Sequence, residues 1–258
     1  MITETSATTS RQRGLEQLAR VGGGSGEERP FAALDPICPD LGRYTVEFVF
    51  GEILSRPGLA LSTREIVTVA ALAALGTARP QLAYHIGGAL NLGWSAAEVV
   101  DVILLAAVHA GFPAALNALG VAREVFAGRD DVVMPIPAPA APAGDPARTG
   151  AALLRALDGL AAFDDLAPDL RRYVVEFAYG EVLARPCLEL PVKELATVAM
   201  LTVLGTAPQQ LGVHLRAARN AGCSRDELVE VLLQMAVYAG FPAAINGLAA
   251  LRDQLSAS

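Results

Sequence analysis

Cysteine, aromatic residues and basic charge are all scarce in this chain of 258 residues. With aromatics at 5%, the core must be built largely from alanine, leucine and valine, which favours closely packed helices over a β-sandwich. The chain has 20 basic and 27 acidic residues. This excess of negative charge argues against nucleic acid as a main partner, because phosphate binding needs a basic surface. Neither a disulfide framework nor a structural metal site is expected, since the scattered cysteines form no C-x-x-C pair: Cys38, Cys187 and Cys223.

A membrane-spanning run and a secretory leader are also missing. The longest apolar stretch, 66–75, has about ten residues, whereas a helix that crosses a bilayer needs about 20. The polar segment 1–10 has no apolar region of the kind found in a secretory signal. We therefore expect a cytoplasmic protein without a membrane partner, whose 53% of apolar residues form a sizeable core.

What the chain does contain is an internal duplication. A shift of 129 residues places Tyr44 on Tyr173 and continues without a gap to Phe126 on Leu255, with about half of the positions identical. A stretch rich in proline and alanine separates the copies, and its prolines prevent a helix from running through it. Two copies with so long a period indicate a duplicated domain rather than a solenoid.

The duplication predicts four parts along the chain. Residues 1–30 are expected to form a flexible N-terminal segment with a short helix over 11–21 and a glycine-rich link. A first unit over 31–127 is followed by a linker over 128–150 and a second unit over 151–258.

Both units are predicted to be helical. No convincing period-2 strand pattern is present, so the fold class is all-α, with two tandem helical-bundle units packed as a pseudo-dimer. Gly76 and Gly205 suit the C-terminal caps of the two central helices, and S-x-x-E capping boxes begin at Ser95 and Ser224. The predicted helices cover 43–55, 62–75, 81–89, 95–109 and 114–126, with counterparts at 172–184, 191–204, 210–218, 224–238 and 243–255.

Histidine is the most informative residue, because there are only three and two of them match between the copies. A histidine can take or give a proton near neutral pH, which makes His85 and His214 candidate catalytic residues. The alternative is a core histidine satisfied by one hydrogen bond. The third histidine, His109, corresponds to Tyr238, and both end a helix. Each is either a partner of the helix dipole or a substrate-contacting donor at the mouth of a pocket.

Acidic residues and arginines repeat along the first helix of each unit. One interpretation is a solvated ion pair between residues four apart. The other is an arginine that holds a substrate carboxylate in a fork and is oriented by a glutamate, and retention in both copies favours this one. The residues are Glu47, Glu52 and Arg56 in the first copy and Glu176, Glu181 and Arg185 in the second.

Two further acidic pairs have structural explanations. Glu65 and Glu194 lie near the start of the central helices and are interpreted as complementing the helix dipole. Capping alone explains Glu98 and Glu227. Phosphate-binding loops, the G-x-S-x-G elbow and the H-E-x-x-H metal motif are absent from the sequence, so no metal or cofactor is expected.

Together these motifs resemble the carboxymuconolactone decarboxylase family, over 44–126 and again over 173–255. The matching segments are FGEILSRPGL (50–59), TRE (63–65), QLAYH (81–85) and AGFPAA (110–115), with counterparts at 179–188, 192–194, 210–214 and 238–244.

The resemblance implies an all-helical unit that oligomerises and that decarboxylates a carboxylated lactone without a cofactor. The other large branch of the superfamily, the alkylhydroperoxidase-D type, uses a C-x-x-C pair a few residues before the family histidine. Segments 77–81 and 206–210 contain no cysteine, so thiol peroxidase chemistry is disfavoured. The chain also departs from the decarboxylase branch, which is usually a single unit with Trp near Leu54 and Leu183 and Tyr where His109 stands.

We therefore expect a cofactor-independent carbon–carbon lyase that acts through an enolate on a small carboxylated lactone or keto acid. In this hypothesis the repeated arginine holds the carboxylate, the repeated histidine moves the proton, and Glu52 or Glu181 tunes it. Decarboxylation, isomerisation and cyclisation share this enolate. The alternative is a non-catalytic helical oligomer that binds a small molecule or scaffolds a partner. The expected partners are a small carboxylate and further copies of the chain, in a dimer or trimer of tandem chains.

Overall fold

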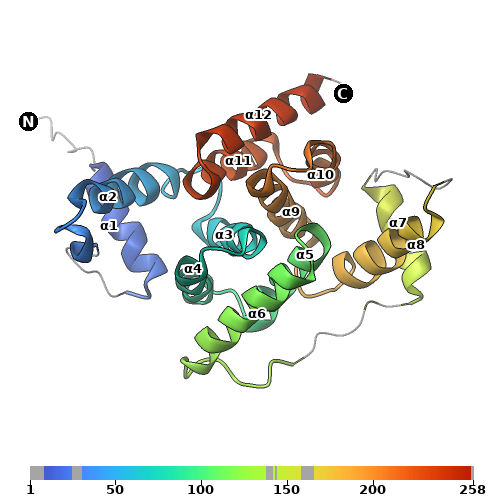
Figure 1. Cartoon of the computed structure of the whole chain (residues 1–258), viewed down its shortest axis with the longest axis horizontal. Coiled ribbons are helices and arrows are strands. Elements are labelled where there is room, and N and C mark those ends of the chain that lie inside the picture. The colour runs from blue at the N-terminus through green and yellow to red at the C-terminus, as the bar shows by residue number, and fades with distance from the viewer. Residues whose placement is uncertain (1–8, 25–30, 138–141, 143, 158–165, 257–258) are drawn as a thin grey trace, which may run out of the picture.

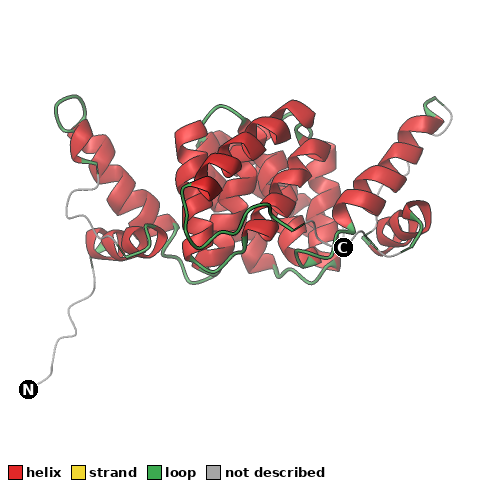
Figure 2. Ribbon diagram, turned by 90° about the horizontal axis from the view of Figure 1, so that it is seen from below, coloured by secondary structure: helices red, strands yellow, loops and turns green. Residues whose placement is uncertain are grey.

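The computed structural model describes residues 9–24, 31–137, 142, 144–157 and 166–256. All regular structure in these ranges is helical, and none of their residues lies in a strand. The predicted all-α class is confirmed. Figure 1 shows a central bundle with α1 and α2 at one end and α7 and α8 at the other. Seen from below, a group of helices projects on either side of the bundle (Figure 2).

The two repeats contribute matching helices in the same order. The first contains α1 (Ser10–Val21), the short 3-10 turn η1 (Ala32–Leu34), α2 (Pro39–Tyr44), the π-helix η2 (Thr45–Ile53), α3 (Leu61–Leu75), α4 (Arg79–Asn91), α5 (Ala96–His109) and α6 (Phe112–Ala127). The second contains α7 (Pro146–Ala156), α8 (Pro168–Tyr173), the π-helix η3 (Val174–Leu183), α9 (Leu190–Leu204), α10 (Pro208–Asn220), α11 (Arg225–Ala239) and α12 (Phe241–Ser256).

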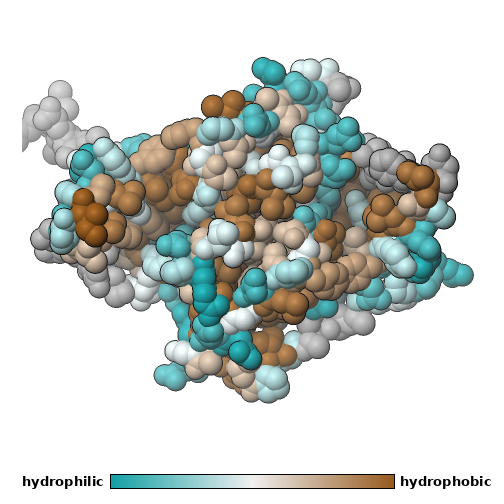
Figure 3. All heavy atoms as spheres, viewed as in Figure 1, coloured by the Kyte–Doolittle hydropathy of each residue, from teal (hydrophilic) through white to brown (hydrophobic). Residues whose placement is uncertain are grey.

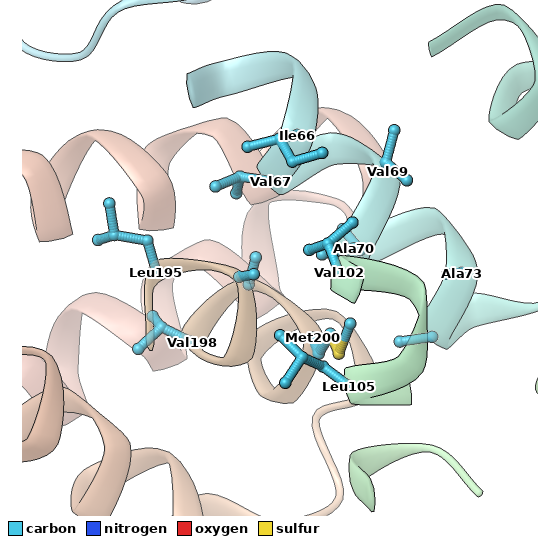
Figure 4. Close-up of a cluster of buried hydrophobic side chains, with 14 of the residues drawn as sticks. Ile66, Val67, Val69, Ala70, Ala73, Val102, Leu105, Leu195, Val198 and Met200 are labelled. Carbon is cyan, nitrogen blue, oxygen red and sulfur yellow. The ribbon is translucent and has the colours of Figure 1, made fainter. Parts of the chain in front are cut away.

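The two repeats share one hydrophobic core. Helices α3 and α9 pack against each other at its centre, and each is also covered by a helix of the other repeat, α11 on α3 and α5 on α9. Figure 4 shows side chains of α3, α5 and α9 meeting there, among them Ile66, Val102 and Met200. All three are fully buried. Burial of each such side chain is worth about 1.5–3 kcal/mol, so the interface between the repeats is a main source of stability.

The predicted caps are present. Gly76 and Gly205 end α3 and α9 in the left-handed region, with φ of 69° and 66°. Ser95 and Ser224 accept hydrogen bonds from the backbone N–H groups three residues on, in complete capping boxes. These local signals are satisfied within a few residues, and they fix where α3 and α9 end and where α5 and α11 begin.

Residues 43–55 and 172–184 differ from the prediction of one regular α-helix each. Most of each stretch is a π-helix, in which Leu54 N–H donates to Val49 O at 2.9 Å and Ala184 N–H donates to Tyr179 O at 3.0 Å. This five-residue spacing is rare and occurs frequently at functional sites. An apolar pattern typical of an α-helix does not distinguish the two spacings, so the π-helices could not be predicted from it.

Helix α1 and its counterpart α7 pack tightly on these π-helices. A Cβ atom at Gly14 or Gly150 would clash with the carbonyl oxygen of Val46 or Val175, so only glycine permits the approach. Helix α7 begins at Pro146, inside the predicted linker, where proline is tolerated as the first residue of a helix. The remaining parts of the predicted links that fall on 25–30, 138–141 and 143 lie outside the described residues.

Apolar side chains also reach the surface. On the face shown in Figure 3 they lie among hydrophilic ones. Two exposed aromatic pairs bridge the repeats, Phe48 with Phe241 at 6.1 Å and Phe112 with Phe177 at 5.8 Å between ring centroids. Among the described helices, none is both long and apolar enough to cross a bilayer. The oligomer and the cytoplasmic location stay predictions.

Candidate functional site

A buried histidine–glutamate pair lies in the first repeat. His85 of α4 faces Glu65 of α3, with 2.7 Å between His85 Nδ1 and Glu65 Oε2. The Glu65 side chain is fully buried and His85 is 6% exposed. The second oxygen, Glu65 Oε1, is buried without a hydrogen-bond partner among the described residues. Such an unpartnered buried carboxylate oxygen is costly, and in native proteins it needs an explanation.

The second repeat contains the same pair. His214 of α10 faces Glu194 of α9, with 2.9 Å between His214 Nδ1 and Glu194 Oε2. Glu194 is fully buried, and its Oε1 also has no hydrogen-bond partner within the described ranges. The same costly arrangement is thus built twice. In both pairs Nδ1 is occupied by the carboxylate, which fixes the ring and leaves Nε2 as the nitrogen for another group.

Each histidine lines its own cavity. The cavity at His85 has a volume of about 650 Å³ and the one at His214 about 290 Å³. Both lie between a central helix pair and the peripheral helices, and both are largely apolar. Side chains from α1, α2 and η2 line the first, among them Leu18, Leu41, Val49 and Phe50. Their counterparts from α7, α8 and η3 line the second, among them Leu154, Leu170, Ala178 and Tyr179.

A side chain from the other repeat completes each cavity. Tyr238 of α11 lies against the His85 ring with centroids 5.7 Å apart, and His109 of α5 lies against the His214 ring at 5.1 Å. Both contacts are edge-to-face. The structure therefore brings His109 and Tyr238 to the cavities, in each case to the histidine of the opposite repeat. Neither cavity has its complete lining within one repeat.

Matching threonines hold these two side chains. Thr68 Oγ1 is hydrogen bonded to the Tyr238 hydroxyl at 3.1 Å, and Thr197 Oγ1 lies 3.4 Å from His109 Nε2. Burial, and to a smaller extent the charge of Glu65, raises the pKa of Tyr238 far above its ordinary value. Burial and the neighbouring His214 lower the pKa of His109 to about 3. Near neutral pH both side chains are therefore uncharged groups that can donate a hydrogen bond.

Tyr84 and Tyr179 bring further phenols to the cavities. The Tyr84 ring meets the His85 ring edge-on at 5.3 Å, and Tyr179 lines the cavity at His214. Desolvation, followed by the charge of the adjacent glutamate, raises the pKa of each hydroxyl to about 12. Neither hydroxyl loses its proton in the physiological range, so each is available as a hydrogen-bond donor.

The repeated arginines bind carboxylates of the opposite repeat rather than face the cavities. Arg56 Nε and Nη2 donate to Glu230 at 2.8–2.9 Å, in the bidentate geometry of a strong ion pair. The fully buried Arg64 donates to the same carboxylate at 2.7 Å. The predicted fork therefore exists, but its carboxylate belongs to α11 of the protein.

The second repeat has a matching cluster. Arg185 Nε is hydrogen bonded to Asp101 of α5, and the buried Lys193 lies 3.3 Å from the same carboxylate. Lys193 also donates to Leu183 O at 3.0 Å. Burial lowers the pKa of Lys193, and the charge of Asp101 partly offsets this. The two clusters join each π-helix to the helix that carries His109 or Tyr238, so they position those side chains.

The other predicted acidic residues lie elsewhere. Glu52 accepts hydrogen bonds from Arg13 and Ser10, and Glu181 is exposed. Glu47 and Glu176 form partly exposed ion pairs with an arginine of the preceding short helix, Arg43 at 3.3 Å and Arg172 at 3.5 Å. In the described structure none of these four lines either cavity. The carboxylate beside each histidine is Glu65 or Glu194 instead of the expected Glu52 or Glu181.

Sequence reasoning assigned Glu65 and Glu194 to the helix dipole and so missed their contact with histidine. The signal that could have found them is their retention, in both copies, near the start of a helix that is expected to be buried on nearly all sides. A buried glutamate without a partner is too costly to keep, so a polar partner from another helix had to be expected. Thr68 and Thr197 repeat in the same way and were also overlooked.

Cysteine and metal chemistry have little support in the described residues. All three cysteines are free, and burial raises the pKa of Cys223 to about 12. A thiol with so high a pKa is a poor nucleophile. No group of three or more His, Cys, Asp or Glu side chains in the described part of the chain is arranged to hold a metal ion.

Comparisons with known proteins show the family to which the chain belongs. The sequence profile of the carboxymuconolactone decarboxylase family matches residues 39–124 and again 168–253. The chain is similar to the 4-carboxymuconolactone decarboxylase of Acinetobacter baylyi, with 40% identity over 89 residues, which are 34% of this chain and 63% of that protein.

Two further relatives are more distant. The nitrosuccinic acid decarboxylase of Metarhizium robertsii is 35% identical over 75 residues, or 29% of this chain and 52% of that protein. An uncharacterised 15.0 kDa protein of Paracoccus denitrificans is 31% identical over 83 residues, or 32% of this chain and 62% of that protein. The chain thus spans between about half and two thirds of the length of these relatives. Because the family profile matches both repeats, which together make up most of the chain, this protein is a tandem member of the carboxymuconolactone decarboxylase family.

Proposed function

We propose that this protein is a cofactor-independent decarboxylase that acts through an enolate on a small carboxylated lactone or keto acid. The observation that carries the proposal is the buried histidine–glutamate pair at an apolar cavity, built twice with distances of 2.7 and 2.9 Å. Two of the relatives are named as decarboxylases of different acids, so their names support the reaction type more than any one substrate.

The histidine is the proton donor in this mechanism. When the carbon–carbon bond to the carboxylate breaks, CO₂ leaves and its bonding electrons form an enolate with the neighbouring carbonyl group. The protonated His85 or His214 then gives the Nε2 proton to the carbon that lost CO₂, and solvent restores the proton afterwards. Glu65 or Glu194 holds the ring through Nδ1 and stabilises the imidazolium form, which is the role of a positioning carboxylate.

The apolar cavity favours loss of CO₂. A carboxylate is poorly solvated among side chains such as Leu18, Val49 and Phe50, and the charge of the enolate is more widely spread. The residues that line the cavity at His85 include no lysine or arginine, so among the described residues no fixed cation of the lining stabilises the carboxylate before it reacts. The electron sink is the carbonyl group of the substrate itself, so the reaction needs no cofactor.

Uncharged hydrogen-bond donors lie near the catalytic histidine in each cavity and can donate to the enolate oxygen. Tyr238 and Tyr84 flank His85, and His109 and Tyr179 line the cavity at His214. Preorganised donors in a desolvated site stabilise a developing oxyanion more than water does. The neutral state of His109 allows it to donate a hydrogen bond without repelling the imidazolium at His214.

Release of CO₂ tests the proposal. Purified protein is incubated with a panel that contains 4-carboxymuconolactone, other carboxylated lactones and β-keto acids, and CO₂ is measured. The expected result is turnover of at least one compound and a loss of at least about 100-fold in the His85→Ala/His214→Ala double variant, the range typical of general acid catalysis. Turnover that survives in the double variant would exclude the histidines as the proton donors.

The same experiment separates the rival function. If no compound of the panel is turned over, but carboxylated lactones bind and the double variant binds them as well as the wild type does, the protein is a small-molecule-binding relative of the family. A correctly folded double variant is shown by its circular dichroism spectrum and thermal midpoint, because removal of a buried imidazole also affects stability.

A further inference from the structure

The two cavities differ more than the sequence identity of the repeats implies. Their volumes are about 650 Å³ at His85 and about 290 Å³ at His214. The second is at the lower end of known small-molecule sites and the first is well within their range. A ring-bearing acid and a compact acid fit these sizes.

Specific residues account for the difference. Phe31, which directly precedes η1, lines the cavity at His85. In the second repeat the place of Gly42 is taken by Arg171, which lines the cavity at His214. The smaller cavity therefore has a long side chain where the larger one has none.

The polar groups differ as well. At His85 the side chain from the other repeat is the phenol of Tyr238, and a second phenol, Tyr84, stands beside the ring. At His214 these places are taken by the imidazole of His109 and by Val213. In the larger cavity two phenol rings contact the histidine edge-to-face, which suits a flat ring. In the smaller one the histidine meets an imidazole and an aliphatic residue precedes it, and Tyr179 is the one phenol among the described lining residues.

From these differences we infer that the chain carries two non-equivalent sites, one at His85 for a ring-bearing carboxylic acid and one at His214 for a compact, open-chain acid. The inference rests on the proposed function in treating both cavities as sites for carboxylated compounds. It goes beyond that function in assigning a different substrate class to each repeat. A single unit repeated in a homo-oligomer has identical sites, and a fused tandem allows them to diverge.

A matched pair of blocking variants separates the two sites. Val49 of η2 and Ala178 of η3 occupy the same place in the repeats, and each lines its own cavity. Val49→Trp fills the first cavity and Ala178→Trp fills the second. Neither residue takes part in the proposed proton transfer. Val49→Phe and Ala178→Phe serve as smaller blocks where a tryptophan variant does not fold.

Two stable probes with one carboxylate each are titrated by calorimetry into the full-length chain. The bulky probe is 1-naphthylacetate and the compact probe is 4-oxopentanoate. We expect 1-naphthylacetate to bind once per chain, to lose at least tenfold in affinity in Val49→Trp, and to change less than twofold in Ala178→Trp. We expect 4-oxopentanoate to bind most tightly at the cavity that contains His214. The affinity of this site for the probe is expected to fall at least tenfold in Ala178→Trp and less than twofold in Val49→Trp.

Equal effects of both blocks on both probes would show that the sites are equivalent and would overturn the inference. Binding of 1-naphthylacetate that responds to Ala178→Trp, or failure of wild type to bind it at millimolar concentration, would do the same. These outcomes concern binding alone. A protein that partitions the probes as expected but releases no CO₂ from any acid would instead contradict the proposed function.

Discussion

The carboxylate of Glu230 in the second repeat lies 2.7 Å from the guanidinium of Arg64 in the first, and Arg64 has no exposed surface. The same carboxylate receives the fork of Arg56. Glu230 is on α11, two turns before Tyr238. This ion pair therefore joins the repeats and also positions the side chain that completes the cavity at His85.

Glu230→Gln is expected to destabilise the protein by about 3 kcal/mol, because loss of one partner leaves a buried charge uncompensated. The change is measured as the free energy of unfolding in urea. Glu124→Gln is the matched control, since Glu124 forms an exposed pair with Arg79, and a change within about 0.5 kcal/mol is expected there. A loss below about 1 kcal/mol in Glu230→Gln would show that Arg64 does not depend on this carboxylate.

Acid is expected to lower the free energy of unfolding, because the buried His109 resists protonation in the folded protein. Burial and His214 lower its pKa to about 3 in the folded protein, whereas an unfolded histidine titrates near about 6.5. Between these values the unfolded state binds more protons, so this contribution is fully present above pH 6.5 and is lost as the pH falls. From pH 6.5 to pH 5 the loss is up to about 2 kcal/mol.

The variant His109→Tyr isolates this contribution, because tyrosine is the residue at the corresponding place in the other repeat. Unfolding free energies are compared between pH 7 and pH 5 for wild type and variant. The variant should show a flatter pH dependence. Parallel curves would mean that His109 is protonated as easily in the folded chain as in the unfolded one.

The carboxylate that matters for turnover should be the one beside the histidine. Glu65→Gln/Glu194→Gln keeps the volume but removes the charge that stabilises the imidazolium, and a loss of about 10²-fold in kcat is expected. Glu52→Gln/Glu181→Gln tests the assignment made from sequence alone. Since Glu52 is bonded to Arg13 and Glu181 is exposed, we expect less than a twofold change there. The reverse order of effects would restore the assignment from sequence.

Tyr238 should act on the site of the other repeat. In a His214→Ala background, where only the cavity at His85 works, Tyr238→Phe removes a donor to the enolate oxygen and should lower kcat about 10-fold to 100-fold. In a His85→Ala background the same substitution should change kcat less than twofold. Equal losses in both backgrounds would indicate a general effect on folding rather than a contribution across the repeats.

Much of the fold was predictable because its signals are local. The capping boxes at Ser95 and Ser224 and the left-handed glycines at Gly76 and Gly205 depend only on residues a few positions apart, and the duplication is read directly from the identity of the two copies. The π-helices were not, since an apolar pattern over ten residues fits either helical spacing.

The sequence singled out the histidines and Tyr238 of the site, but not the contacts that they make. His85 and His214 stand out as rare ionisable residues in apolar helices, but their partners come from other helices. Glu65 lies 20 residues before His85, and Tyr238 comes from the other repeat. A single sequence does not show which helix faces pack against one another. For the same reason the repeated arginines fitted a substrate carboxylate as well as they fit Glu230 and Asp101.

Deuterium incorporation during turnover in D₂O tests the central claim most directly. A decarboxylated product whose new C–H bond comes from His85 or His214 must carry one deuterium at the carbon that lost CO₂, and mass spectrometry and NMR locate it. The account predicts one deuterium per product at that carbon and at least a 100-fold slower appearance of labelled product in the His85→Ala/His214→Ala variant. Labelled product formed at the wild-type rate by a folded double variant would contradict it.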